Sequence, residues 1–274
     1  MTPHPHSEPG APHGFAPNPK LIHPPALPVY PSGPLVPLIL SVIRSSLMFL
    51  FWGLLTPVAA LIGFPWTLIS GKIDFLYSFG TWIAITGVRI SGVQPVIQGL
   101  ERLDPEGTYI FMSNHVSNLD PPLLIPLIPR RTSVLAKKEL FSIPVLGKGF
   151  RMGSFVPVDR NNLEAAKASL REAREVLSSG ISMTIFPEGT RSRTGGLLPF
   201  KKGPFFLAME TSVPVVPITI VNTGYLWPKG SLRVRSGPAT VIFHPPIFPG
   251  DYPDRETLML AVRQQIAGAL PPEA

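Results

Sequence analysis

"TYIFMSNHVSNLDPP" (residues 108–122) joins a strand signal, a turn and a helix signal in fifteen residues of this 274-residue chain. The apolar run 108–113 predicts a buried β-strand. Asp is a favoured N-cap and Pro is favoured at the first helical position, so "DPP" predicts a helix beginning at Asp120. His115 lies between the two, where functional side chains of open α/β sheets gather.

The spacing between His115 and Asp120 constrains how these side chains can meet. Residues five apart on one regular helix differ by about 140° around its axis. The pair can therefore touch only if the chain turns between them. Two roles for Asp120 stay open: its carboxylate caps the helix, or it orients the His115 imidazole and leaves the other ring nitrogen as a general base. A carboxylate has two oxygens and can do both.

Beyond this stretch, strand and helix patterns alternate. The sequence predicts further strands at 132–136, 153–158, 181–186 and 213–221, and a terminal strand pair in "SLRVRSG" and "ATVIFHPPI". An amphipathic helix is predicted over 163–177, with Asn161 and Glu164 as its capping box and Gly180 just after its end. Helices are also predicted in "GPFFLAMETS" and "DRETLMLAVRQQIAGAL". We therefore predict an α/β domain over residues 95–274, with a mixed, mostly parallel sheet flanked by helices.

Two segments of different character precede this domain. Residues 1–34 are rich in Pro, His and Gly and predict a disordered tail. Residues 35–94 predict apolar, membrane-associated helices, since no charged residue occurs between Arg44 and Lys72 and about 20 apolar residues suffice to cross a bilayer. Pro57 and Pro65 interrupt that run, so a straight span, a bent half-inserted hairpin and a buried soluble helix all stay open. The shorter apolar stretch 75–88 suits a core or interfacial helix.

The charge of the chain is concentrated in its centre. The net charge is +7, and between residues 130 and 202 Lys and Arg outnumber Asp and Glu by 14 to 6. Such an excess attracts nucleic acid, anionic lipid or a phosphorylated small molecule. The chain has no cysteine, which excludes disulfides, thiolate metal sites and a cysteine nucleophile.

"TIFPEGTRS" (184–192) is the second stretch with chemical potential. Gly189 allows a tight turn after a strand, and Arg191 is a bidentate anion donor. Glu188 either holds that arginine or accepts a hydrogen bond from a substrate hydroxyl, and a surface ion pair is the structural alternative. If the sheet is parallel, these groups converge with His115 and with further cations on one edge; those cations are Lys137, Lys138, Arg160, Lys201 and Lys202.

This convergence favours a phosphorylated substrate and acid/base chemistry. Nucleic acid is not expected, because the cations lie in separate loops with no interleaved aromatic residues. His244, the other histidine outside the tail, has no acidic residue near it in sequence and is interpreted as structural.

Four blocks in order resemble the glycerolipid acyltransferases: "NHVSNLD" (114–120), "GSFVPVDR" (153–160), "FPEGTRS" (186–192) and "VPVVPITI" (213–220). "AKKELFSIPVLG" (136–147) is similar to the segment between the first two. The resemblance covers roughly residues 95–245 and implies the family's fold. It also implies transfer of an acyl chain from acyl-CoA or acyl carrier protein to the free hydroxyl of a lysophospholipid, lysophosphatidic acid first among them.

The resemblance also implies roles for individual residues. His115 would take the proton of the acceptor hydroxyl and Asp120 would hold the productive tautomer, with no acyl-enzyme, cofactor or metal. The substrate would be bound by Asn114, Lys137, Arg160, Glu188, Gly189, Thr190 and Arg191. The apolar stretch 45–71 resembles membrane-docking helices of bacterial members, which implies a bacterial inner membrane with the catalytic domain facing the cytoplasm.

Three alternatives remain open. Another lysophospholipid or glycerol phosphate could be the acceptor, or water could, as in a thioesterase. A non-catalytic lipid-binding membrane protein is the alternative from another class, although such a relative would be expected to lose His115 or Asp120.

Overall fold

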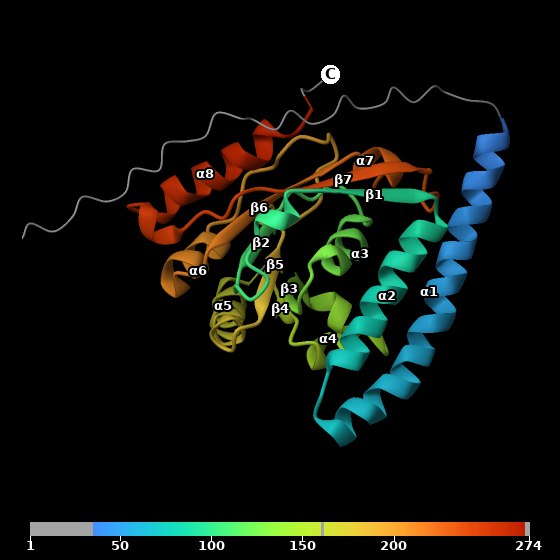
Figure 1. The fold of residues 1–274 in the computed structure, drawn as a ribbon, viewed down its shortest axis with the longest axis horizontal. Helices are drawn as coiled ribbons and strands as arrows, with labels where there is room; N and C mark the ends of the chain where they lie inside the picture. The colour runs from blue at the N-terminus through green and yellow to red at the C-terminus, as the bar shows by residue number, and fades with distance from the viewer. Residues whose placement is uncertain (1–34, 160–161, 272–274) are drawn as a thin grey trace, which may run out of the picture.

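A seven-stranded sheet forms the centre of the computed structural model, which describes residues 35–159 and 162–271 (Figure 1). The predictions of a disordered tail at 1–34 and of a role for Arg160 lie outside the described residues. The strand order is β1-β7-β6-β2-β5-β3-β4. The strands are β1 (Val93–Gln98), β2 (Ile110–Ser113), β3 (Thr132–Lys137), β4 (Val156–Val158), β5 (Ser182–Ile185), β6 (Val215–Val221) and β7 (Gly237–Phe243).

All neighbouring strands pair in parallel except β6 and β7, which are antiparallel. The predicted mixed, mostly parallel sheet is therefore confirmed. The predicted terminal strand pair is wrong in its first member, because residues 231–236 form no strand. In that segment the backbone N–H of Val234 donates to Oγ of Ser45, so the chain is held against the N-terminal helix instead of a strand. β7 pairs with β1, a strand that the sequence did not reveal.

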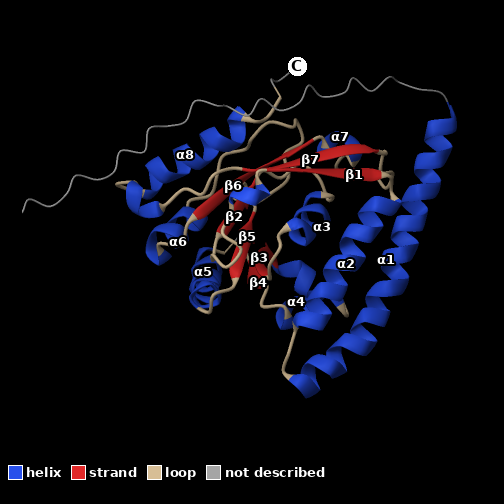
Figure 2. Ribbon diagram, in the orientation of Figure 1, coloured by secondary structure: helices blue, strands red, loops and turns tan. Residues whose placement is uncertain are grey.

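Helices cover both faces of the sheet (Figure 2). On one side lie α1 (Leu35–Ser70), α2 (Asp74–Ile90), α3 (Asp120–Leu124) and α4 (Leu146–Met152). On the other lie α5 (Leu163–Ser178), α6 (Gly203–Thr211) and α8 (Arg255–Gly268), and α7 (Thr223–Leu226) follows β6. Short 3-10 helices occupy Leu100–Arg102, Ile125–Leu127, Lys138–Ser142 and Pro249–Asp251.

The central strand β2 is buried on both faces, which explains its uninterrupted apolar sequence. Phe111 packs in the core on the α1–α3 side, whereas Ile110 and Met112 pack in the core on the α5, α6 and α8 side. This alternation follows from the period of two along a strand. Burial on both faces fixes the register of β2 and hence the place where its C-terminal residues emerge.

The amphipathic helix α5 begins at Leu163 as predicted, but its N-cap lies one residue later than predicted. Its N-cap is Asn162, whose side chain accepts the N–H of Ala165 at 3.0 Å, and Asn161 lies outside the described residues. The end is as predicted, since Gly180 follows the helix with φ of +81°.

The apolar N-terminal run forms one helix, α1, that passes unbroken through Pro57 and Pro65. It curves toward a turn at residues 71–73 and pairs with α2, so the helix is not broken at the prolines and the turn lies after them (Figure 1). The choice between a straight span and a bent, half-inserted hairpin stays open. Gly87 permits the close packing of the two helices, because a Cβ there would lie 2.0 Å from Nε1 of Trp52. That indole donates to the carbonyl of Ile83 at 3.1 Å.

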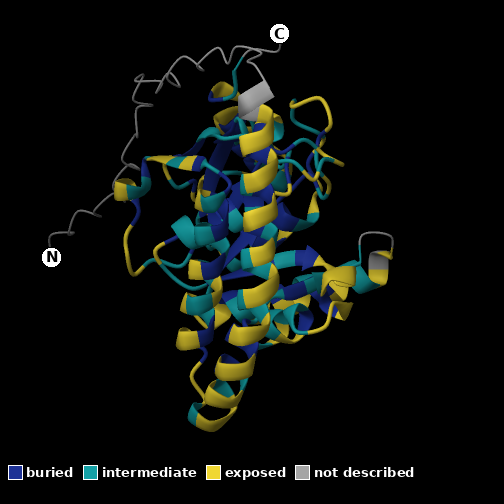
Figure 3. Ribbon diagram, turned by 90° about the vertical axis from the view of Figure 1, so that its right-hand side faces the viewer, coloured by how far each residue is buried: buried dark blue, intermediate teal, exposed yellow. Residues whose placement is uncertain are grey.

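The outer face of α1 is apolar and exposed along the helix (Figure 3). Its exposed residues include Ile39, Ile43, Leu47, Leu50, Leu54, Val58, Ile62 and Ile69. Most of them recur every three or four residues, so they form one stripe on one face. Within the described residues, 38–70 is the one helix long and apolar enough to cross a membrane, and only 22% of its most apolar window is buried. The interpretation as a buried soluble helix is therefore wrong.

Candidate active site

His115 follows the C-terminal end of β2 and lies at the middle of the edge where the parallel strands end. Its Nδ1 lies 2.7 Å from Oδ2 of Asp120, so the predicted contact between the two side chains is confirmed. The Asp120 side chain is fully buried, and 14% of the His115 side chain is exposed. Since a buried carboxylate is a hydrogen-bond acceptor, Nδ1 carries the proton and Nε2 is left with a free lone pair.

Asp120 does not cap α3, contrary to the first of its two predicted roles. It is the first residue of the helix, and the preceding residue Leu119 already has helical dihedrals. The carboxylate points back into the preceding turn, where Oδ2 also accepts the backbone N–H groups of Val116 and Ser117, each at 2.8 Å. The carboxylate of Asp120 therefore binds the backbone of the turn between His115 and Asp120 as well as the His115 ring. These contacts fix the position of the imidazole.

Thr223 completes this arrangement and was not identified from the sequence. Its hydroxyl donates to Oδ1 of Asp120 at 2.6 Å, and Thr223 is itself buried at the start of α7. Both oxygens of a carboxylate that lies away from water are thereby paired. The one signal in the sequence is that Thr223 comes two residues after the end of strand β6, a neighbour of β2.

His115 is held from three further directions. Its backbone N–H donates to Oε1 of Glu188 at 2.8 Å, and its carbonyl accepts the N–H of Ser192 at 2.8 Å. Its ring stacks on that of Phe186, with centroids 4.3 Å apart and planes 27° apart. These contacts come from the end of β5, which pairs with β2, so strand pairing brings the two blocks together.

Glu188 is buried, and its carboxylate joins two backbone segments; we call this arrangement the brace. Oε1 receives the N–H of His115, and Oε2 receives the N–H of Leu198 at 2.9 Å. Burial raises the pKa of Glu188 and outweighs the opposing effect of these two backbone hydrogen bonds. The guanidinium of Arg263 continues the brace, since it donates to the carbonyls of Leu197 and Leu198. The predicted contact of Glu188 with a substrate hydroxyl stays a prediction.

Asn114 joins the ends of β2 and β6. Its Oδ1 accepts the N–H of Ile220 at 2.7 Å, and its Nδ2 donates to the carbonyl of the same residue at 2.9 Å. The side chain therefore continues the sheet pairing where the backbone of β2 has ended. One N–H of the amide is left for a substrate, and its predicted binding role stays a prediction.

The loop after β5 presents the predicted anion-binding residues. Gly189 has φ of +70°, the left-handed conformation that favours glycine, and it turns the chain between Glu188 and Arg191. Thr190 is exposed. Nη1 of Arg191 is buried and has no hydrogen-bond partner among the described residues. An arginine with an unpaired donor beside His115 is suited to bind an anion.

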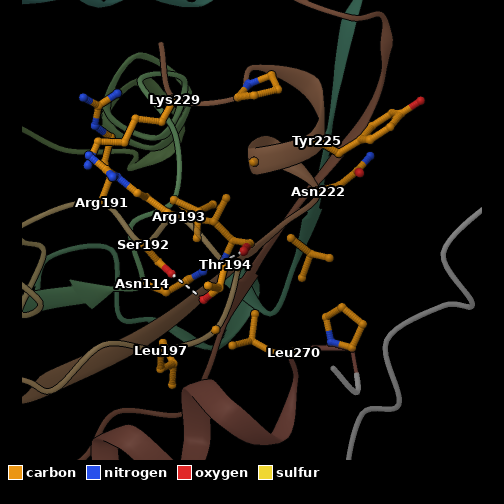
Figure 4. Close-up of a pocket in the computed structure, with 18 of the residues that line it drawn as sticks. Asn114, Arg191, Ser192, Arg193, Thr194, Leu197, Asn222, Tyr225, Lys229 and Leu270 are labelled. Atoms are coloured by element: carbon orange, nitrogen blue, oxygen red, sulfur yellow. Dashed lines mark hydrogen bonds between the residues drawn. The ribbon is translucent and has the colours of Figure 1, made fainter. Parts of the chain in front are cut away.

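A cleft of about 1640 Å³ opens beside this loop (Figure 4). Asn114, Val116, Arg191 and Ser192, which lie on either side of His115 or in the loop that contacts it, line the cleft. Its cationic lining residues are Arg191, Arg193, Lys229 and Arg263. In Figure 4 the side chains of Arg191, Arg193 and Lys229 gather on one side. The sequence did not single out Arg193, Lys229 or Arg263; Lys229 and Arg263 do not follow a predicted strand.

The predicted convergence of cations is correct only in part. β3, β4 and β5 are parallel to β2, so residues after these strands do reach the same edge. Lys137, however, lies two strands from β2, with its amine 3.4 Å from a carboxylate oxygen of Glu139. Lys138 pairs with Asp159 and Lys202 with Glu256.

His244 lies in the core, as expected for a structural residue. Its Nε2 is 2.8 Å from the hydroxyl of Thr219, which donates onward to the carbonyl of Ile266, so Nε2 of the imidazole is the donor to Thr219. Burial, followed by the nearby charge of Arg102, lowers the pKa of His244 to about 4.

Comparison with known proteins gives a consistent result. A family model described as "Acyltransferase" matches residues 94–221. A 1-acyl-sn-glycerol-3-phosphate acyltransferase of Cocos nucifera is 38% identical over 225 residues, which are 81% of this chain and 72% of that protein. The human 1-acyl-sn-glycerol-3-phosphate acyltransferase alpha is 32% identical over 157 residues, 57% of this chain and 56% of that protein.

A solved structure is also similar. The crystal structure of the 1-acyl-sn-glycerophosphate (LPA) acyltransferase PlsC from Thermotoga maritima superposes with a TM-score of 0.69 at 27% sequence identity. The match covers 83% of this chain and 95% of that one.

Proposed function

The chain belongs to the acyltransferase family that contains the 1-acyl-sn-glycerol-3-phosphate acyltransferases, and from that premise we propose that it acylates lysophosphatidic acid to phosphatidic acid. The observation that carries this proposal is the buried Asp120 bound to Nδ1 of a partly exposed His115 beside a cationic cleft. A general base and an anion site side by side suit an acceptor that carries both a hydroxyl and a phosphate.

The proposed reaction proceeds by direct transfer. Nε2 of His115 removes the proton of the acceptor hydroxyl while the hydroxyl oxygen attacks the thioester carbonyl. The tetrahedral intermediate collapses, the C–S bond breaks, and the imidazolium returns the proton to the leaving thiolate. Asp120 stabilises the imidazolium and keeps the proton of the resting ring on Nδ1. The products are an ester and a free thiol.

Binding of the phosphate is assigned in this proposal to Arg191, supported by its unpaired buried Nη1. Lys137 and Arg160 stay predicted contributors. The donor is a thioester of either coenzyme A or acyl carrier protein, and we propose no cofactor beyond it.

An acceptor panel tests the function. Purified protein in detergent, supplied with acyl-CoA or acyl carrier protein, should release thiol and form phosphatidic acid when lysophosphatidic acid is present. Other lysophospholipids, glycerol phosphate and water should react at least tenfold more slowly. A faster reaction with one of these would replace the proposed acceptor, and thiol release at the same rate without acceptor would indicate a thioesterase.

A matched pair of variants tests the role of His115. His115→Gln removes the base and should abolish transfer. His244→Gln makes the same change at the other described histidine and should leave kcat within about twofold at neutral pH, since His244 makes its hydrogen bonds to Thr219 inside the core. Comparable activity of His115→Gln and His244→Gln would refute the mechanism.

We also propose that the protein is associated with a membrane through α1, which lies in the plane of one leaflet. The rest of the protein contacts one side of α1 along its length. Ser45 is hydrogen-bonded to Val234, Trp52 is hydrogen-bonded to Ile83, and the amine of Lys148 lies over the ring of Phe64. The apolar stripe lies on the exposed face. A spanning helix would be surrounded by lipid over about 30 Å, whereas an in-plane helix buries one face. Placement in a bacterial inner membrane stays a prediction, because the relatives include chloroplastic plant proteins.

The absence of cysteine makes this orientation measurable. Single cysteines at Ile39, Leu54 and Ile69, each exposed on α1, would carry a spin label in vesicles. We expect equal depths for the three labels. Depths that differ by half a bilayer or more between Ile39 and Ile69 would instead establish a spanning helix.

A further inference from the structure

The candidate active site does not explain the excess of Lys and Arg between residues 130 and 202, because most of these cations do not line the cleft. Four cations on the side of α5, α6 and α8 are paired with carboxylates. The pairs are Lys167–Glu164, Arg174–Glu210, Lys202–Glu256 and Arg255–Glu256. The charge of these four cations is largely offset by three carboxylates.

The cations beside α1 have no such balance. Lys72, Lys148, Arg151, Arg233 and Arg235, which we call the basic border, have no carboxylate within 4.0 Å among the described residues. Lys72, Lys148 and Arg151 are exposed, and Arg233 and Arg235 are partly exposed. No acidic residue occurs from residue 35 to residue 73.

One direct contact and the chain positions of the other cations place the border near both halves of α1. Nζ of Lys148 lies 5.2 Å from the ring centroid of Phe64, and Arg151 follows one turn later in α4. Lys72 occupies the turn that ends α1. At the other half, Arg233 and Arg235 flank Val234, which bonds Ser45.

Exposed apolar side chains accompany these cations. Ile143, just before α4, is 44% exposed, and Leu232, next to Arg233, is 80% exposed. Mixed apolar and basic surfaces of this kind are typical of protein that rests on the headgroup layer, with apolar groups entering the leaflet and cations meeting lipid phosphates.

We propose that the basic border is a binding surface for anionic lipid headgroups, which directs the protein to negatively charged leaflets. The inference rests on the proposed membrane association through α1. Apolar burial by α1 alone would favour neutral and anionic bilayers equally. Each basic side chain held near an anionic surface contributes about fivefold in affinity, so the border converts a general membrane affinity into a charge-dependent one.

Sedimentation with vesicles tests the proposal on the full chain. The unmodified protein should bind vesicles of phosphatidylcholine mixed with phosphatidylglycerol more tightly than vesicles of phosphatidylcholine alone, and added salt should reduce the difference. The double variant Lys148→Gln/Arg151→Gln should lose about 25-fold in affinity for the anionic vesicles. Its binding to neutral vesicles should not change.

A matched variant controls for net charge. Lys167→Gln/Arg171→Gln removes two exposed cations from α5, on the side away from α1, and should bind like the unmodified chain. Equal binding of the unmodified chain to both kinds of vesicle, or equal losses in the two double variants, would overturn the proposal.

The outcome is separable from the acyltransferase function. In detergent micelles the Lys148→Gln/Arg151→Gln variant should retain the acyl transfer rate of the unmodified chain; a loss there would also overturn the proposal, since these cations would then act in the reaction. An unmodified chain that binds anionic vesicles but transfers no acyl group refutes the proposed function and leaves the lipid surface in place.

Discussion

The hydroxyl of Thr223 donates a 2.6 Å hydrogen bond to Oδ1 of Asp120, across a sequence separation of 103 residues. The other carboxylate oxygen holds Nδ1 of His115 and two backbone N–H groups. Thr223 lies three residues beyond the fourth sequence block and anchors the aspartate of the first block. The parallel pairing of β2 with β6 brings these two segments together.

Replacing Thr223 by Val should slow catalysis without unfolding the protein. The change keeps the shape and removes the donor, so Asp120 loses one hydrogen bond to a charged group, worth about 1.5–3 kcal/mol. We expect kcat to fall by about 10- to 100-fold with little change in KM, because the lost contact positions the base and does not touch substrate. Thr223→Ser, which retains the hydroxyl, should recover most of the rate. A rate in Thr223→Val equal to that of the unmodified protein would exclude this role.

Replacing Glu188 by Gln should damage both stability and rate. The two N–H groups of His115 and Leu198 bind different oxygens of Glu188, and in a glutamine one of these oxygens becomes an NH2 donor that would face a backbone N–H. One buried N–H group is left unpaired, at a cost of about 1–3 kcal/mol in the free energy of unfolding. Urea denaturation measures this loss, and kcat should fall with it. The same change at Glu210, an α6 residue whose partner is exposed Arg174, should cost less than about 1 kcal/mol. Equal midpoints for the two variants would contradict the brace.

His244 should make the fold sensitive to mild acid. Its pKa is about 4 in the folded protein, against 6.5 for an ordinary histidine. Between these values the unfolded chain binds the proton and the folded protein does not, so the stability due to the neutral ring is complete above pH 6.5 and is lost as the pH falls toward 4. The expected loss is about 3 kcal/mol. His244→Gln should flatten the dependence in this window. A slope that persists in the variant would have to arise from other groups.

Two glycines of α2 should respond in opposite directions to alanine. A Cβ at Gly87 would lie 2.0 Å from Nε1 of Trp52, whereas nothing lies within 4 Å of a Cβ at Gly80. Gly80→Ala should therefore stabilise the helix by about 0.5–1 kcal/mol through backbone entropy. Gly87→Ala should destabilise the protein by about 1–3 kcal/mol, because α1 and α2 must separate. Thermal unfolding in detergent distinguishes them, and stabilisation by both would show that the helices adjust freely.

The sequence predicted those elements whose signals are local. β2, β5, β6 and α5 have continuous apolar or amphipathic patterns and were predicted close to their observed bounds. β1 was missed because its outer positions are exposed and it contains Pro95, so neither a buried run nor a clear alternation results. Residues 231–236 were read as a strand from their alternation, which reflects Val234 packing against α1.

The candidate site divides in the same way. The pairing of His115 with Asp120 followed from spacing and from the helix start at "DPP". The places of Thr223, Arg263 and Lys229 at the site did not, because each comes from a different segment far along the chain. No local sequence pattern predicts which residues from distant segments come together at the site.

By itself the sequence determined the alternation of strands and helices, the turn that lets His115 meet Asp120, and an N-terminal run too apolar for water. These follow from steric preferences and periodicity over a few residues. Only the tertiary structure decided that Asp120 binds the turn before it instead of capping α3, and that α1 exposes one apolar stripe near cations that have no carboxylate partner among the described residues. Hydrogen bonds and burial depend on which distant segments lie side by side. The order of the strands in the sheet determines these neighbours, and sequence spacing does not.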